Sequence, residues 1–209
     1  MDTKKSLVAL ALVALIGIVG GTYAYFTITS NLNNTFKAGT YATSVTEEFV
    51  SPTNWTPGTT TQKKINVANK GSVDIVARAK YTEAWTSASG ASLPTVRDGL
   101  TIAQFTTGAN WTKGTGDWYY YNAVLTNGQT SSDFISAVTF NPNFQLKEDA
   151  DIKCTETKTA TGTTVDCANL TTGYAGATYT LNVTIETIQA DQAKTVWSAD
   201  ASVIPSPAA

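Results

Sequence analysis

The sequence contains no histidine. Histidine is the commonest metal ligand and the side chain best suited to acid–base work near neutral pH. Its absence excludes Ser-His-Asp triads, Cys-His pairs and the HExxH zinc motif. We therefore expect no catalytic residue, no cofactor and no metal site, and we expect that the protein is not an enzyme.

Charged residues are scarce as well, at 14% of the chain, and the formal net charge is −2. No basic stripe follows any part of the sequence, so a nucleic-acid partner is not expected. Two acidic groups occur, Glu47-Glu48 and Glu148-Asp149-Asp151. Their oxygens could bind calcium weakly, but neither group has EF-hand spacing, and a solvated loop or strand edge is the simpler interpretation.

Cysteine is limited to Cys154 and Cys167, which lie in a polar stretch rich in threonine and glycine. In an exported protein, an even and closely spaced pair indicates a disulfide that closes a hairpin. Such a bridge would stabilise the fold by roughly 3 kcal/mol on the loop-entropy model. Two free thiols are the alternative.

What the sequence does have is a long apolar run near its start. Two lysines precede Leu7–Val19, a Gly-Gly pair ends this run, and Ala24 supplies the small residue that signal peptidases accept. This order is typical of an export signal. We predict a signal peptide over residues 1–24, cleaved between Ala24 and Tyr25. An uncleaved membrane anchor over residues 7–26 is the alternative.

Apolar and polar residues alternate directly after the predicted cleavage site. One side of this segment carries Phe26, Ile28, Leu32 and Phe36, whereas the other side is mostly Thr and Asn. A period of two with β-branched residues predicts a strand with one buried face. We therefore predict an N-terminal strand over residues 25–37.

The rest of the chain reads as short strands separated by turns. Gly114 and Gly116 predict the turn of a hairpin between Trp111 and Trp118–Val124. The other predicted strands lie around 65–67, at 73–81, at 100–105, at 137–142, at 144–154 and, most clearly, at 179–187.

Strands at this spacing, without long helical periods, predict an all-β fold. We expect an antiparallel, jelly-roll-like β-sandwich with short helical segments over residues 38–199. One such helical segment is predicted at Gln189–Trp197. The Pro/Ala-rich residues 200–209 are expected to form a flexible tail.

Five stretches, taken in order, resemble the TasA/camelysin family of Gram-positive exported proteins. They are GGTYAYFT (20–27), NTFKAGTY (34–41), NKGSVDIVARAKY (69–81), GDWYYYNAVLTNGQTSS (116–132) and LNVTIETIQAD (181–191). The residues that follow Phe26, and the two cysteines, depart from the usual family pattern.

The resemblance implies a secreted subunit of biofilm-matrix fibres, found in the extracellular matrix or at the cell surface. It implies head-to-tail self-assembly, in which the N-terminal strand of one copy completes a sheet of the next. The inserting side chains would be Phe26, Ile28, Leu32 and Phe36. The implied partners are other copies of the chain, a signal peptidase of the SipW type and an accessory fibre-anchoring protein. Membrane contact would occur only through the uncleaved leader.

Two other function classes remain open from the sequence. One is a secreted metallopeptidase of the camelysin type. The other is a surface adhesin or a minor, fibre-anchoring subunit, with the rings of Trp118–Tyr121 stacking on glycans. For these rings the simpler interpretation is a strand whose alternate side chains line the core and the surface.

Overall fold

The computed structural model describes residues 38–207, which belong to one compact unit. The predicted signal peptide, its cleavage site at Ala24 and Tyr25, and the predicted N-terminal strand lie outside the described residues. So do the four predicted inserting side chains, Phe26, Ile28, Leu32 and Phe36. Within the described part, no helix is long and apolar enough to cross a membrane.

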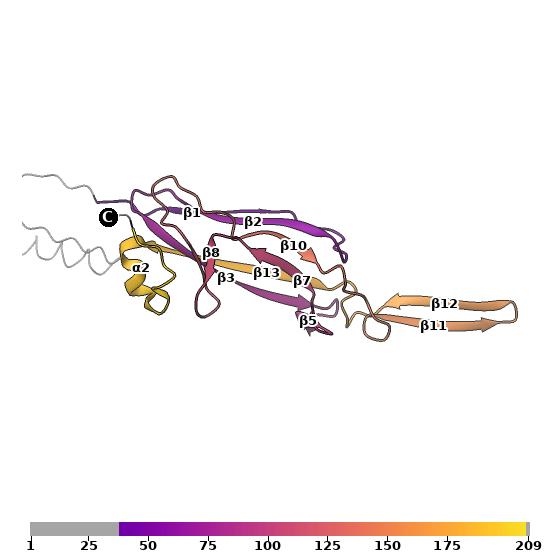
Figure 1. The fold of residues 1–209 in the computed structure, drawn as a ribbon. Helices are drawn as coiled ribbons and strands as arrows, with labels where there is room; N and C mark the ends of the chain where they lie inside the picture. The colour runs from indigo at the N-terminus through magenta and orange to yellow at the C-terminus, as the bar shows by residue number, and fades with distance from the viewer. Residues whose placement is uncertain (1–37, 208–209) are drawn as a thin grey trace, which may run out of the picture. The chain divides into compact units, whose positions relative to one another are not determined.

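Two antiparallel sheets form the body of the molecule (Figure 1). The first sheet has the order β1-β2-β10-β7. Its strands are β1 (Thr43–Phe49), β2 (Thr60–Asn69), β10 (Ile135–Phe140) and β7 (Ala103–Thr107).

The second sheet has the order β13-β3-β9-β8, and β4 pairs with the end of β3. Its strands are β13 (Thr178–Gln189), β3 (Ile75–Thr86), β9 (Tyr119–Tyr121), β8 (Trp111–Lys113) and β4 (Ser92–Leu93). The predicted hairpin is confirmed, because β8 and β9 pair in register from Trp111 opposite Tyr121 to Lys113 opposite Tyr119.

The core lies between the two sheets because alternate residues of each strand point inward. In β2 these residues are Lys63, Ile65 and Val67, all buried. Aromatic rings from both sheets meet in the same cluster, and Tyr81 of β3 contacts Phe105 of β7 edge to face. The prediction of an all-β, antiparallel β-sandwich with little helix is therefore confirmed.

A second, smaller core covers the outer side of β9. Tyr120 is only 1% exposed and packs beneath α2 (Ala190–Val196) and the residues that follow it, whereas Tyr119 and Tyr121 pack against the main core. Both sides of this strand are thus covered, which differs from the core-and-surface arrangement expected for the Trp118–Tyr121 rings. The predicted short helix is confirmed by α2.

The first part of the expected flexible tail is packed. A 3₁₀ turn, η1, spans Ser198–Asp200, Asp200 is 6% exposed, and Ile204 is 3% exposed within the second core. Composition alone suggested disorder here because proline and alanine form no strong pattern. The apolar side chain of Ile204 and the carboxylate of Asp200 hold the segment in place instead.

Asp200 connects this C-terminal segment to the β8–β9 hairpin. Its carboxylate accepts hydrogen bonds from the Tyr120 hydroxyl at 2.7 Å and from the Thr115 amide at 2.7 Å. A side chain at Gly114 would place its Cβ 2.6 Å from Oδ1 of Asp200, so the approach requires glycine there. Close by, the Arg78 guanidinium lies between two rings, 4.1 Å from Trp118 and 4.3 Å from Trp197.

We expect stability to fall in acid partly because of Asp200. Burial alone would raise the pKa of Asp200, but the hydrogen bonds from Tyr120 and Thr115 outweigh it, so the pKa lies below the usual 3.8. A group with a lowered pKa stabilises the fold above its unfolded value and loses that effect as the pH falls through the folded value. Urea unfolding at pH 7 and pH 3 should therefore show a smaller pH dependence in Asp200→Asn than in the native chain. The matched control is Asp117→Asn, whose carboxylate is 82% exposed; an equal change in both variants would contradict this role.

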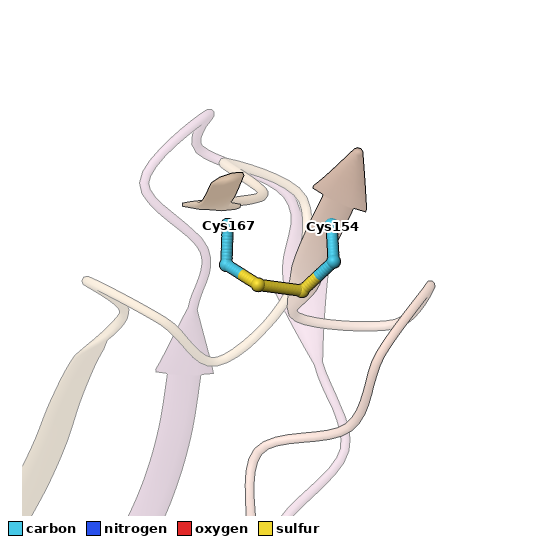
Figure 2. Close-up of a disulfide and its surroundings, with 2 residues drawn as sticks. All are labelled: Cys154 and Cys167. Carbon is cyan, nitrogen blue, oxygen red and sulfur yellow. A yellow bond between two sulfur atoms is a disulfide. The ribbon is translucent and has the colours of Figure 1, made fainter. Parts of the chain in front are cut away.

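Two further hairpins leave the sandwich. The small one pairs β5 (Val96–Arg97) with β6 (Leu100–Thr101). The long one pairs β11 (Ile152–Thr159) with β12 (Gly162–Asn169), and Figure 1 shows it extending beyond the ends of the two sheets. Cys154 lies opposite Cys167 in this hairpin and the two are joined by a disulfide (Figure 2), which confirms the predicted bridge.

The base of the long hairpin is fixed by a buried ion pair. Asp151, which is fully buried, accepts a hydrogen bond at 2.6 Å from Arg97 and two more from the backbone amides of Lys147 and Tyr174. The Arg97 guanidinium also packs over the rings of Phe144 and Tyr174. Asp151 is thus committed to Arg97 and the backbone, and it does not act as a free calcium ligand.

Candidate functional site

Two strand edges on one side of the sandwich have no ladder partner among the described residues. β1 pairs only with β2, and the twelve-residue β13 pairs only with β3. Each edge therefore presents backbone N–H and C=O groups that no described strand satisfies. Such an edge is a template for a further strand.

The inner side of β1 is apolar but exposed. In the β1–β2 ladder, Val45 lies opposite Val67 and Phe49 lies opposite Lys63, so these side chains share the core-facing side of the sheet. Val67 is fully buried, whereas Val45 is 54% exposed and Phe49 is 48% exposed. The inner face of the first sheet is therefore apolar as far as β1, but the buried part of that face ends at β2.

The opposite wall of the opening is β13. Its alternate residues Tyr179, Leu181, Val183 and Ile185 pack against the core but stay only partly buried. The side chains between them are exposed and polar, as the alternation in the sequence predicts. An incompletely covered apolar row therefore runs along a free strand edge.

The opening has two different ends. At one end the hydroxyls of Tyr41 and Thr187 share a hydrogen bond, which ties the start of β1 to the end of β13. At the other end lies a pocket of about 570 Å³, lined by residues that include Phe49, Trp55 and Tyr179. The ring of Trp55 stacks on the rings of Trp85 and Tyr179, with distances between ring centroids of 5.9 Å and 5.4 Å. We call the whole opening, from Tyr41 to this pocket, the β1–β13 groove.

One ion pair interrupts the apolar lining of the groove. The ammonium of Lys63 pairs with the carboxylate of Glu47, which lies between Val45 and Phe49 on the inner side of β1. The same ammonium lies 4.7 Å from the centre of the Phe49 ring. Because the charges already satisfy one another, an occupant needs no charge of its own at this point.

Tyr179, which lines the pocket of the groove, is held in its neutral form. Burial, together with the hydrogen bond from its hydroxyl to Glu83 at 2.7 Å, raises the pKa of Tyr179. The Tyr179 hydroxyl therefore contributes no charge to the groove near neutral pH.

The residues predicted from the sequence fall in different places. Cys154 and Cys167 lie on the long hairpin and take no part in the groove. Among residues 38–207, no group of acidic or cysteine side chains is arranged to hold a metal ion. Sequence reasoning missed β1 altogether, although the apolar residues Val45 and Phe49, both on one side of an extended segment, were a signal for it.

Comparison with known proteins gives one family match. The model of the camelysin metallo-endopeptidase family matches residues 4–89, which include β1, β2 and β3. No curated protein matches the chain. The family match confirms the resemblance to TasA/camelysin proteins, and it includes β1 and β2, which form one wall of the groove.

Proposed function

We propose that this chain, whose N-terminal part matches the camelysin family, is a structural subunit of extracellular biofilm-matrix fibres. Each subunit would insert its N-terminal strand, residues 25–37, into the β1–β13 groove of the next copy. The observation that carries the proposal is the groove itself: two free strand edges with apolar, core-facing side chains exposed between them.

The physics of such a joint is that of strand addition. The backbone of an added strand pairs with a free edge, and its alternate side chains fill the space between the sheets. Insertion of Phe26, Ile28, Leu32 and Phe36 at roughly 1.5–3 kcal/mol each would give about 6–12 kcal/mol before ordering costs. Because the strand and the groove are different surfaces of one chain, the contact is head to tail and propagates a filament.

Cleavage after Ala24 acts as the switch in this scheme. Before cleavage, the leader keeps the strand at the membrane, and afterwards the strand is free to insert. The partners are therefore a signal peptidase of the SipW type, other copies of the chain and an accessory fibre-anchoring protein. The site of action is outside the cell, in the matrix or at the cell surface.

Deletion of residues 25–36 from the mature chain tests the proposal directly. We expect a folded monomer that no longer polymerises, because the groove keeps its walls but loses its occupant. Negative-stain microscopy reports filaments, and circular dichroism reports the fold. Filaments of normal appearance from the shortened chain would refute strand donation through this segment.

A point variant tests the inserting side chains without shortening the chain. Ile28→Asp should block polymerisation, because it places a charge among the predicted inserting side chains. Thr29→Asp, on the opposite side of the same strand, is the matched control and should still polymerise.

A minor, fibre-anchoring subunit would instead fail to form filaments alone and would attach to the ends of filaments made by another protein.

The matching family is described as one of metallo-endopeptidases, which favours a second candidate, an enzyme of that type. The chain offers no histidine, and both cysteines are joined in the disulfide, so a zinc centre would have to be built from carboxylates. Casein digestion by the purified chain that is abolished by a chelator would favour this candidate over the fibre subunit.

A further inference from the structure

The β11–β12 hairpin is built as a stiff arm with free edges. Within residues 38–207, β11 and β12 pair with each other and with no other strand, apart from a bridge between Ile152 and Glu148 at the base. Every residue of β12 is exposed, and Val165 is 59% exposed. A two-stranded hairpin is marginally stable on its own in water. Here the disulfide and the buried Asp151–Arg97 pair at its base hold it in place.

The outward-facing backbone groups of β11 can be assigned. The Cα atoms of Cys154 and Cys167 are 4.0 Å apart, the short separation typical of a non-hydrogen-bonded antiparallel pair. The N–H and C=O of Cys154 therefore point away from β12, and the alternation repeats this at Glu156 and Lys158. The free edge of β11 thus carries the backbone groups of these three residues.

The charges on this edge are self-complementary. Across the hairpin, Glu156 lies opposite Val165 and Lys158 lies opposite Thr163, so neither has a charged cross-strand partner. Their contact with each other is long, at 4.0 Å, and both side chains are more than half exposed. If β11 met a second β11 in antiparallel fashion about Thr157, each Glu156 would lie opposite the Lys158 of the other copy.

We propose that the hairpin pairs edge to edge with the same hairpin of a second copy, β11 against β11, with Thr157 on the two-fold axis. Glu156 and Lys158 then form the hydrogen-bonded pairs, and two cross-strand ion pairs close the contact. The result is a four-stranded sheet, which removes one free edge from each arm. Because the contact is isologous, it joins two molecules and stops there.

This contact is distinct from strand insertion and goes beyond the proposed function. It uses the arm, which Figure 1 shows extending away from the strands that form the β1–β13 groove. Insertion would lengthen a filament, whereas pairing of the arms would join two filaments side by side. A matrix protein with both contacts would form bundles.

A cysteine placed on the predicted axis tests the register. In a non-hydrogen-bonded pair the Cβ atoms are closest, so Thr157→Cys should form an intermolecular disulfide under mild oxidation. The matched control is Thr164→Cys, which lies opposite Thr157 in β12; both threonines are exposed. It should not cross-link, because two strands would separate it from its copy. The readout is the dimer band on a non-reducing gel of the mature chain.

Charge exchange tests the chemistry of the contact. Glu156→Lys should weaken cross-linking of the Thr157→Cys chain about tenfold, because both ion pairs become repulsive. Adding Lys158→Glu should restore it, since the exchanged charges are again complementary. A cross-linking yield that does not change with these charges, or cross-linking through Thr164→Cys instead, would overturn the proposed register.

The outcomes separate this inference from the proposed function. Filaments that form singly, with no Thr157→Cys dimer, would refute the paired arms and leave strand insertion standing. Covalent dimers without filaments would refute strand insertion and leave the paired arms standing. Bundled filaments that separate into single ones in the Glu156→Lys variant would support both.

Discussion

Replacing Val45 by aspartate is expected to abolish filament formation while the subunit stays folded. Val45 is 54% exposed on the inner side of β1, so the free subunit tolerates a charge there. An inserted strand would bury that charge without a partner, at a cost of about 3–5 kcal/mol. The assembly constant should therefore fall 100-fold or more, as measured by sedimentation and negative-stain microscopy.

The control for this variant is Val50→Asp. Val50 follows β1 directly and is 82% exposed, but it lies beyond the strand. It should assemble like the native chain. If Val45→Asp also assembled normally, the β1–β13 groove would not be the site that receives the strand.

Removal of the Asp151 carboxylate should have the largest effect on stability. Asp151→Ala leaves the Arg97 guanidinium, which is 17% exposed, without its buried partner, and leaves the amides of Lys147 and Tyr174 without an acceptor. Breaking a buried ion pair in this way lowers the free energy of unfolding by about 3–5 kcal/mol. Urea unfolding followed by tryptophan fluorescence measures the loss.

Asp98→Asn provides the comparison for Asp151, because Asp98 has a φ of 54°, a left-handed conformation that asparagine tolerates and in which alanine would add strain of its own. Asp98 also approaches Arg97, at 3.9 Å, but its side chain is 55% exposed. An exposed pair contributes at most about 1 kcal/mol. Equal losses in the two variants would show that burial is not what makes the Asp151 pair important.

The strands that could be predicted are those whose residues alternate strongly. Tyr179, Leu181, Val183 and Ile185 identified β13, and the closely spaced cysteines identified the stapled hairpin. β1 was missed because Glu47 interrupts the apolar side of its alternation, and Glu48 beside it makes the segment look like an acidic, solvated one. Glu47 turns inward and is neutralised by Lys63, a pairing that depends on a neighbouring strand and is not visible in a single segment.

The groove could not be predicted because it follows from strand order. Alternation shows that β13 has an apolar side, but not that the strand lies at the edge of its sheet. Likewise, the apolar character of Tyr120 was evident, whereas its cover by α2 and Ile204 depends on where the C-terminal segment returns. Local pattern determines which residues form strands, and long-range pairing determines which of them remain open.

The position of β13 has a thermodynamic consequence. This strand is hydrogen-bonded to β3 along its whole length, so it stays in place only while the main core is folded. Anything that binds only the folded form stabilises it, by about 2.7 kcal/mol when present at 100 times its dissociation constant. On the proposed function, a subunit in the interior of a filament should melt at a higher temperature than a free one. The copy at the tip, whose groove is empty, is then the weakest point of the polymer, and dissolution by heat or urea should start there.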